Sequence, residues 1–294
     1  MNSPDALPAD VRALYPFASH WLDTPAGRVH YIDEGPRDAD NAVICVHGNP
    51  TWSFFYSNVI IALSKTRRVI AIDHLGCGMS DKPQDYTYLL ANHVENLARL
   101  VSTLQQSTLH CIVHDWGGPI GLAVAQRYAN RVGKLVVMNT AAFFGPCPLR
   151  IRLCRIPLLG PVLVRGLNGF AGPAACMAVE RPLPAAVKHG FLFPYNSWAN
   201  RVAVLRFVED IPLEPNHPSR QTMTAIESSL EKLHGKPMLI AWGMRDFCFS
   251  PVYLAEWRHR FPEATVREFP NAGHYLLEDA GDAIIPGLVD FLGR

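Results

Sequence analysis

Residues 109–118 read Leu-His-Cys-Ile-Val-His-Asp-Trp-Gly-Gly, and this stretch decides the fold. Residues 109–113 are an apolar run of strand length, and the two glycines lead into a helical run that begins near Pro119. A strand, a sharp turn and a helix in this order are typical of a nucleophile elbow, which projects one side chain above a parallel sheet. Here that side chain is Asp115, which is ionised at neutral pH because its reference pKa is about 3.9. It can attack a saturated carbon without help from a base, and a histidine stays available to activate water in a later step.

Apolar runs of strand length alternate with helix-length segments, which predicts an α/β protein with a mostly parallel central sheet flanked by helices. Besides the strand at 109–113, we expect a hairpin at 20–22 and 29–32, strands at 42–46, 68–72, 134–138, 237–242 and 264–269, and helices at 89–105, 252–261 and 283–292. From about residue 142 to 231 the chain is rich in proline and aromatic residues and has no convincing strand. We therefore predict a core domain of residues 1–141 and 232–294 and an inserted helical cap of residues 142–231.

Composition excludes several classes of protein. The 294 residues are 49% hydrophobic and 18% charged with a formal net charge of +1, so neither disorder nor a nucleic-acid partner is indicated. The first ten residues lack the basic start and apolar run of a secretory signal. The seven cysteines form no C-x-x-C pair, and Cys45 and Cys111 lie inside apolar strands, where cysteine behaves as a small hydrophobe. We expect a cytoplasmic protein without a structural metal or cofactor.

Asp246 and His274 complete a candidate catalytic set with Asp115, because the elbow architecture places nucleophile, acid and histidine in that chain order. Asp246 follows the strand at 237–242, and His274 follows the strand at 264–269. Both therefore lie just past the carboxyl ends of strands, where open parallel sheets place their sites. Taken alone, Asp246 is equally well interpreted as a helix N-cap.

The segment His47-Gly48-Asn49-Pro50 follows the strand at 42–46, in the position that supplies an oxyanion-hole amide in this architecture. Backbone N–H groups of Asn49 and Trp116 can then hold the oxygen of an ester intermediate. Their side chains are also donors, and two neutral donors beside a carboxylate suit an anionic leaving group. The alternative is that Asn49 only shapes the turn and Trp116 only packs under the cap.

Together with the segment Asp73-His74-Leu75-Gly76-Cys77-Gly78-Met79-Ser80-Asp81, these motifs resemble the haloalkane dehalogenases of the α/β-hydrolase fold over nearly the whole chain. The resemblance implies Asp115 as nucleophile, His274 as base, Asp246 as its acid partner, and Asn49 with Trp116 as the leaving-group-binding pair. Family members with a glutamate after the sixth strand have no counterpart here, because residues 139–141 contain no carboxylate.

Within that family, residues 210–213, 217–219 and 242–249 are most similar to a branch that includes β-lactone decarboxylases of long-chain olefin biosynthesis. This resemblance implies a hydrophobic substrate, a cis-3-alkyl-4-alkyl β-lactone, which is opened at Asp115 and loses carbon dioxide to leave a cis-alkene. It also implies association with other enzymes of olefin biosynthesis. Hydrolysis of haloalkanes is the alternative activity.

Other functions fit the residues less well. A serine esterase is disfavoured because no G-x-S-x-G segment occurs, and a fluoroacetate dehalogenase is expected to carry arginine where this chain has Trp116. An epoxide hydrolase needs acidic tyrosines in the cap, and residues 142–231 contain only Tyr195. A non-catalytic ligand-binding protein is the alternative from another class, against which the complete catalytic set argues.

Two features of the cap stay open. Residues 149–165 place Arg150, Arg152, Arg155 and Arg165 around an apolar run that is too short to span a membrane. This segment is either a lip that contacts a membrane surface or a partner, or two short helices whose leucines pack inward. The cap phenylalanines either line an alkyl-chain pocket or form the cap core: Phe143, Phe144, Phe170, Phe191, Phe193 and Phe207.

Overall fold

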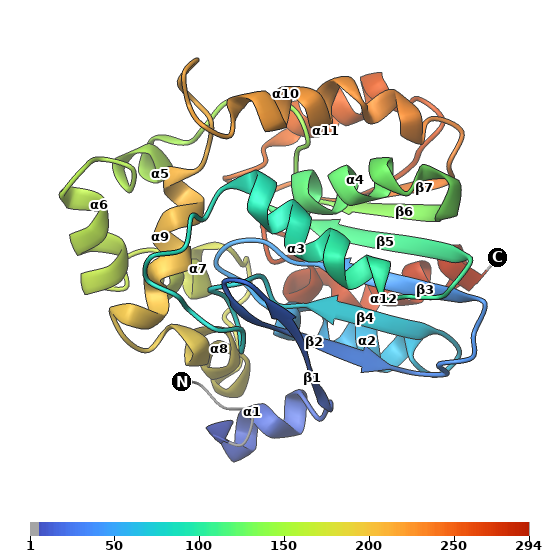
Figure 1. Ribbon diagram of the computed structural model, residues 1–294, viewed down its shortest axis with the longest axis horizontal. Coiled ribbons are helices and arrows are strands. Elements are labelled where there is room, and N and C mark those ends of the chain that lie inside the picture. The colour runs from blue at the N-terminus through green and yellow to red at the C-terminus, as the bar shows by residue number, and fades with distance from the viewer. Residues whose placement is uncertain (1–5, 294) are drawn as a thin grey trace.

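A computed structural model describes residues 6–293 and has an eight-stranded sheet at its centre, in the order β1-β2-β4-β3-β5-β6-β7-β8 (Figure 1). The strands are β1 (Ser19–Thr24), β2 (Gly27–Glu34), β3 (Asn41–Val46), β4 (Arg68–Ile72), β5 (Thr108–His114), β6 (Val132–Met138), β7 (Met238–Gly243) and β8 (Thr265–Phe269). Strands β3 to β8 are mutually parallel, whereas β2 runs antiparallel to both β1 and β4. The predicted mostly parallel sheet is confirmed.

The central strands are apolar along their whole length because helices cover both faces of the sheet. Successive side chains of a strand point to opposite faces, so each strand contributes to two separate cores. Ile44 and Val46 of β3 belong to one core with Val113 of β5. Val43 and Cys45 belong to the other with Ile112. The sheet is therefore packed between two layers of helices, and the loops at its ends are anchored on buried strands.

Helices α3 (Leu90–Ser102) and α4 (Gly117–Arg127) pack against each other on one face of the sheet, and α2 (Ser57–Leu63) and α12 (Leu276–Gly293) pack on the other. Figure 1 shows α3 and α4 on the near side and α12 on the far side. The last helix on the near-side layer, α11 (Pro251–Arg260), follows β7, and the short α1 (Ala9–Leu14) precedes the sheet. The flanking helices predicted from the sequence are confirmed.

Two helix starts differ from the prediction. Helix α4 begins at Gly117, before Pro119, because the glycines themselves take helical geometry directly after the turn. Helix α12 begins at Leu276, earlier than the predicted start near Ala283, but it is interrupted at the non-helical Ala280, and the part after this break corresponds to the predicted helix. The acidic residues Glu278, Asp279 and Asp282 interrupt the apolar pattern, so the spacing of apolar residues does not indicate the first turn of the helix.

Between β6 and β7 the described chain holds helices and turns without a strand. The helices are α5 (Leu149–Leu153), α6 (Leu159–Pro161), α7 (Ala171–Met177), α8 (Ala185–Leu192), α9 (Val202–Glu209) and α10 (Arg220–Ser228). Figure 1 places α5 to α9 beyond the carboxyl ends of the parallel strands, whereas α10 packs on α3 and α4. The division into a core and a cap domain of residues 142–231 stays a prediction.

The opening stretch of the chain, predicted not to be a secretory signal, lies partly outside the described residues, since the structure describes it only from residue 6 onward. Among residues 6–293, no helix is long and apolar enough to cross a membrane.

Candidate active site

Asp115 lies at the tight turn between β5 and α4. Its φ is 51°, a backbone angle that residues other than glycine rarely adopt. The turn is possible because glycines surround it. A Cβ on Gly117 would lie 1.9 Å from the carbonyl oxygen of Val46, and one on Gly48 would lie 2.0 Å from Asp115 Oδ1. The predicted strand, turn and helix are confirmed, and the turn lifts the carboxylate above the carboxyl edge of the sheet.

The structure brings Asp115, Asp246 and His274 together from the loops after β5, β7 and β8. His274 Nδ1–H donates to Asp246 Oδ2 over 2.7 Å, and His274 Nε2 lies 3.7 Å from Asp115 Oδ2. All three side chains are buried. The imidazole therefore bridges the two carboxylates, in the geometry that a nucleophile, a histidine and an orienting acid require.

Asn139, at the end of β6, holds Asp246 in place and was missed as a functional residue by the sequence analysis. Its Nδ2–H donates to Asp246 Oδ2 over 2.9 Å, and its Oδ1 accepts from Gly243 N over 2.7 Å. The other oxygen of Asp246 accepts the Cys248 N–H over 2.6 Å. The N-cap interpretation of Asp246 is wrong, because α11 begins only at Pro251.

The charges of the site favour an ion pair. Burial would lower the pKa of His274, but the charge and hydrogen bond of Asp246 and the charge of Asp115 outweigh it, so the pKa is raised above its ordinary value of 6.5. Burial raises the pKa of Asp115, although His274 and the backbone amides of Trp116 and Asn49 oppose it. The Asp115 and Asp246 carboxylates therefore favour the protonated form of His274, and a protonated His274 in turn favours the ionised form of Asp115.

The predicted oxyanion amides point at the Asp115 carboxylate. Asn49 N–H donates to Asp115 Oδ1 over 2.6 Å, and the backbone N–H of Trp116 also hydrogen-bonds the carboxylate. The Asn49 side chain donates through Nδ2 to the carbonyl of Val204 in α9 over 3.1 Å, which uses one of its two amide hydrogens. The Trp116 ring packs against Phe207, with ring centroids 5.4 Å apart. Both side chains line the cavity above Asp115.

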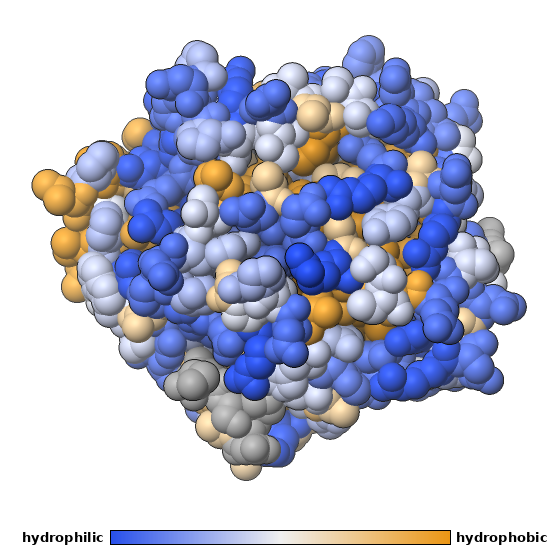
Figure 2. Space-filling view, in the orientation of Figure 1, coloured by the Kyte–Doolittle hydropathy of each residue, from blue (hydrophilic) through white to orange (hydrophobic). Residues whose placement is uncertain are grey.

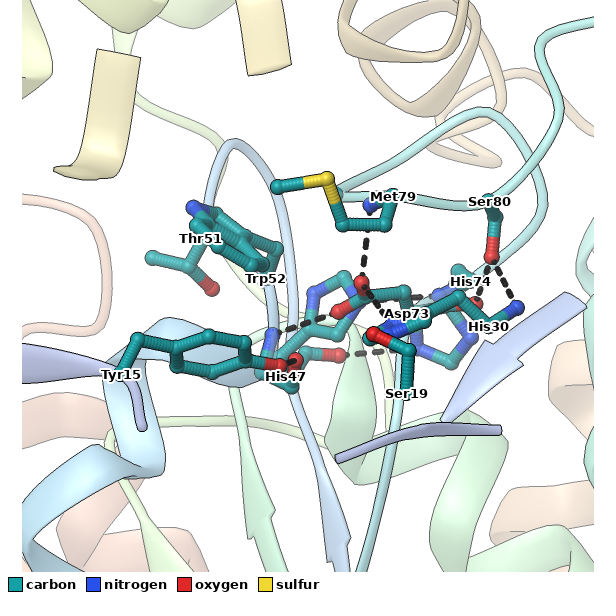
Figure 3. A network of polar contacts seen from close by, with 12 residues as sticks. Tyr15, Ser19, His30, His47, Thr51, Trp52, Asp73, His74, Met79 and Ser80 are labelled. Carbon is teal, nitrogen blue, oxygen red and sulfur yellow. Dashed lines mark hydrogen bonds and ion pairs between the residues drawn. The ribbon is translucent and has the colours of Figure 1, made fainter. Parts of the chain in front are cut away.

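A chain of buried polar contacts braces the loop that carries Asn49 (Figure 3). His47 Nδ1–H donates to Gly48 O over 2.7 Å, and His47 Nε2 accepts the His74 N–H over 3.0 Å. His74 Nε2–H returns a bond of 2.9 Å to His47 O. Beside them, the Asp73 carboxylate accepts from His30, Ser53 N and Met79 N. The segment 73–81 thus acts here as the support of the Asn49 loop.

His114, directly before Asp115, is a second positioning residue that the sequence analysis missed. Its Nε2–H donates to His274 O over 2.9 Å, and its ring stacks on Phe55 at 4.4 Å. Burial first, and the neighbouring His274, lower its pKa well below the ordinary value, so it stays neutral. It ties the loop of His274 to β5 without adding charge to the site.

A cavity of about 440 Å³ opens above Asp115 and His274. The six phenylalanines in question, between residues 143 and 207, divide into two groups. Three line the cavity: Phe143, Phe144 and Phe170. Phe191 stacks instead on Tyr275 and Phe207 on His93, and Phe193 is also outside the cavity lining. Phe247 and Phe249 also line the cavity, from the loop after β7, a role that their residue type alone does not indicate. The wall is therefore mostly apolar, and its polar side chains other than Arg150 and Tyr253 lie at or beside Asp115.

Comparisons with known proteins agree with this geometry. A model of the alpha/beta hydrolase fold family matches residues 41–153 and 187–281. The chain is 44% identical over 287 residues to a cis-3-alkyl-4-alkyloxetan-2-one decarboxylase of Shewanella oneidensis, covering 95% of this chain and 89% of the relative. It is 38% identical to the protein of the same name from Xanthomonas campestris pv. campestris, covering 95% of this chain and 97% of the relative. Haloalkane dehalogenase 2 of Mycobacterium tuberculosis is 33% identical, covering 95% of this chain and 96% of the relative.

Among solved structures, haloalkane dehalogenase DbeA from Bradyrhizobium elkani superposes with a TM-score of 0.83 at 23% identity, covering 94% of this chain and 98% of that one. At this identity the likeness concerns the fold alone. The relatives that match nearly the full length place the chain in a narrower group, because their sequence identity is 44% and 33%. The chain therefore belongs to the α/β-hydrolase fold family and, within it, to the group that contains the oxetan-2-one decarboxylases and the haloalkane dehalogenases.

Proposed function

We propose that this protein decarboxylates cis-3-alkyl-4-alkyl oxetan-2-ones, which are β-lactones, to cis-alkenes and carbon dioxide. The observation that carries the proposal is the position of the Asp115 carboxylate at the floor of a mostly apolar cavity of about 440 Å³. The two relatives named for this reaction support it, at 44% and 38% identity. The strain of the four-membered ring makes the lactone a suitable target for a carboxylate.

In the first step, Asp115 attacks C4, the saturated ring carbon that is bonded to the ring oxygen. Asp115 Oδ1 is held by the Asn49 N–H, so Oδ2, on the side of His274, is the oxygen that attacks. A bond forms between Oδ2 and C4 while the bond from C4 to the ring oxygen breaks, which releases a carboxylate on C3. The indole N–H of Trp116 and the free amide hydrogen of Asn49 are the donors for that new anion.

In the second step, the bond between C3 and the carboxyl carbon breaks and releases carbon dioxide. Its electron pair forms the C3–C4 double bond, and the bond from C4 to Oδ2 breaks, which restores the Asp115 carboxylate. Inversion in the first step followed by anti elimination in the second converts a cis lactone to a cis-alkene. No water and no proton are consumed. His274 as an imidazolium stabilises Asp115 as a leaving group, and Asp246 holds the proton on His274.

The proposal includes a place for the enzyme in the cell. We propose a cytoplasmic enzyme of olefin biosynthesis that associates with other enzymes of that biosynthesis. Its substrate must come from an enzyme that closes a β-lactone ring. The seven cysteines, all of which are free thiols, support a reducing compartment.

Haloalkane hydrolysis is the second candidate, because it uses the same nucleophile and the same donors. Asp115 displaces the halide, and a water molecule then opens the ester after His274 has removed its proton. Epoxide hydrolysis is disfavoured by the cap. Tyr195 lies outside the cavity lining and its hydroxyl donates to Thr51 O over 2.9 Å, while Tyr253 in the cavity wall donates to Pro146 O over 2.6 Å.

A direct comparison of substrates tests the assignment. Purified protein receives a cis-3,4-dialkyl β-lactone or a primary bromoalkane, and alkene with carbon dioxide or bromide is measured. We expect kcat/KM to be higher for the lactone by at least about tenfold, because its two alkyl chains fill the apolar cavity and that binding energy serves the reaction. Higher efficiency with the bromoalkane, and no alkene from lactones of several chain lengths, would assign the protein to the haloalkane dehalogenases.

The pH dependence distinguishes the two reactions within one protein. Hydrolysis of the bromoalkane needs neutral His274, so its rate should fall as pH drops through the raised pKa of His274. Decarboxylation needs no base and should persist as long as Asp115 stays ionised. From about pH 8 to about pH 6, the ratio of lactone to bromoalkane turnover should rise at least about threefold.

Asp246→Asn is the matched control for this profile. It removes the charge that raises the pKa of His274, so burial dominates and the bromoalkane profile moves to lower pH. Parallel profiles for the two substrates in the unchanged enzyme would mean that both reactions need the same base, contrary to the proposed route.

A further inference from the structure

The lip, which we define as residues 149–167, carries more than half of the exposed large hydrophobic side chains of the described chain. They are Leu149, Leu153, Ile156, Leu158, Leu159, Val162 and Leu167. Leu158 is 86% exposed and Leu149 is 72% exposed, so the alternative in which these leucines pack inward is wrong. Figure 2 shows hydrophobic surface at the edge of the molecule where Figure 1 places α6. Soluble proteins rarely gather apolar side chains in this way except where they bind something.

The charge of the lip has one sign. Residues 149–170 contain four arginines and no aspartate or glutamate. Arg155 pairs with Glu214 and Arg165 donates to Gln84, whereas the guanidinium of Arg152 is exposed and makes no hydrogen bond or ion pair within residues 6–293. Arg150 stacks over the Phe247 ring at 5.0 Å and keeps its charge at the surface. An apolar surface with basic residues at its border complements a negatively charged, greasy partner.

The same segment forms part of the cavity wall. Arg150, Ile151 and Cys154 line the cavity, while Leu149 and Leu153 on the same short helix α5 point outward into solvent. One side of helix α5 therefore faces the cavity, and its other side carries the exposed leucines. Whatever covers the lip therefore lies next to this part of the cavity wall.

We propose that the lip binds the surface of a lipid bilayer that carries anionic headgroups, with the cavity entrance held against the membrane. The leucines enter the boundary of the acyl chains while the arginines stay at the level of the headgroups, as in helices that lie in a membrane interface. Binding to lipid does not depend on the catalytic residues. Only one corollary, that an alkyl-chain substrate enters from the bilayer, rests on the proposed function.

Flotation with lipid vesicles tests the proposal. The full-length protein is mixed with vesicles of phosphatidylcholine alone or with about 30% phosphatidylglycerol, and the fraction that floats is measured. We expect binding to the anionic vesicles, reduced at least about tenfold in partition coefficient by the combined changes Leu149→Gln, Leu153→Gln and Leu158→Gln. Arg152→Glu should weaken binding to the anionic vesicles at least about fivefold and leave the neutral vesicles unaffected.

A second triple variant controls for a general loss of surface apolarity: Leu14→Gln, Ile61→Gln and Val289→Gln, three exposed positions on α1, α2 and α12. It should float like the unchanged protein. Each variant must keep its melting temperature and its turnover of a short-chain soluble substrate, which separates failed lipid binding from failed chemistry. Equal loss in both triple variants, or no flotation of the unchanged protein, would overturn the proposal. A concentration-dependent dimer that the lip variant abolishes, without flotation, would assign the lip to a second copy of this chain.

Discussion

Asp115→Asn should lower turnover of both the β-lactone and the bromoalkane by at least about a thousandfold, because an amide oxygen is too weak a nucleophile to displace either leaving group. The fold should survive. The amide oxygen of the new side chain can still accept the Asn49 N–H that Asp115 Oδ1 accepts over 2.6 Å. Alkene and bromide are measured with substrate in excess, and the melting temperature confirms that the variant is folded.

The control for this variant is a measurement of its intact mass, which shows whether the asparagine is still present. An asparagine in a site built to activate a carboxylate can be converted back to aspartate, so intact-mass measurement must accompany each assay. Residual turnover that follows the fraction of restored aspartate supports the assignment. A folded variant of correct mass that still forms alkene at a comparable rate would show that another group attacks the substrate.

His274→Ala should trap the bromoalkane reaction halfway. Asp115 still displaces bromide, but no base remains to activate water, so hydrolysis of the ester should slow at least about a hundredfold. One equivalent of bromide is then released in a burst, and the peptide that contains Asp115 gains the mass of the alkyl group. The lactone reaction should lose less activity and accumulate no adduct, because its second step needs no water.

The double variant Asp115→Asn with His274→Ala is the matched control, and it should give neither burst nor adduct. An adduct on a different peptide, such as one that contains Cys248 in the cavity wall, would contradict the role of Asp115. Accumulation of an adduct from the lactone as well would mean that water, and not the release of carbon dioxide, completes that reaction.

The central strands were predictable because burial between two helical layers makes them largely apolar. Residues 42–46 and 68–72 were predicted within one residue of β3 and β4. Helix starts were less predictable, since they depend on local backbone geometry. The break at Ala280 arises where Asp279 turns inward to accept the backbone N–H groups of Gly273 and Glu180, a contact that no spacing in the sequence indicates.

The candidate site was predictable where chain order and strand ends determine it, as for Asp115 and His274. Asn139 and His114 were not, although both are polar residues at strand ends. Asn139 acts on Asp246, which is 107 positions away, and His114 acts on His274, which is 160 positions away, so their partners become visible only in the folded chain. The same holds for the phenylalanines, because the residue type is identical whether the ring lines the cavity or packs in the core.

The hydrogen bond from Asn49 Nδ2 to Val204 O has a mechanical consequence. Val204 lies on α9, above the sheet, whereas Asn49 lies on the loop after β3, so one bond joins the roof of the cavity to the machinery at its floor. If α9 rose to admit a substrate, it would pull away the partner that orients the Asn49 amide. We therefore expect α9 to keep its place during turnover, while substrate and product exchange past α5, which also lines the cavity.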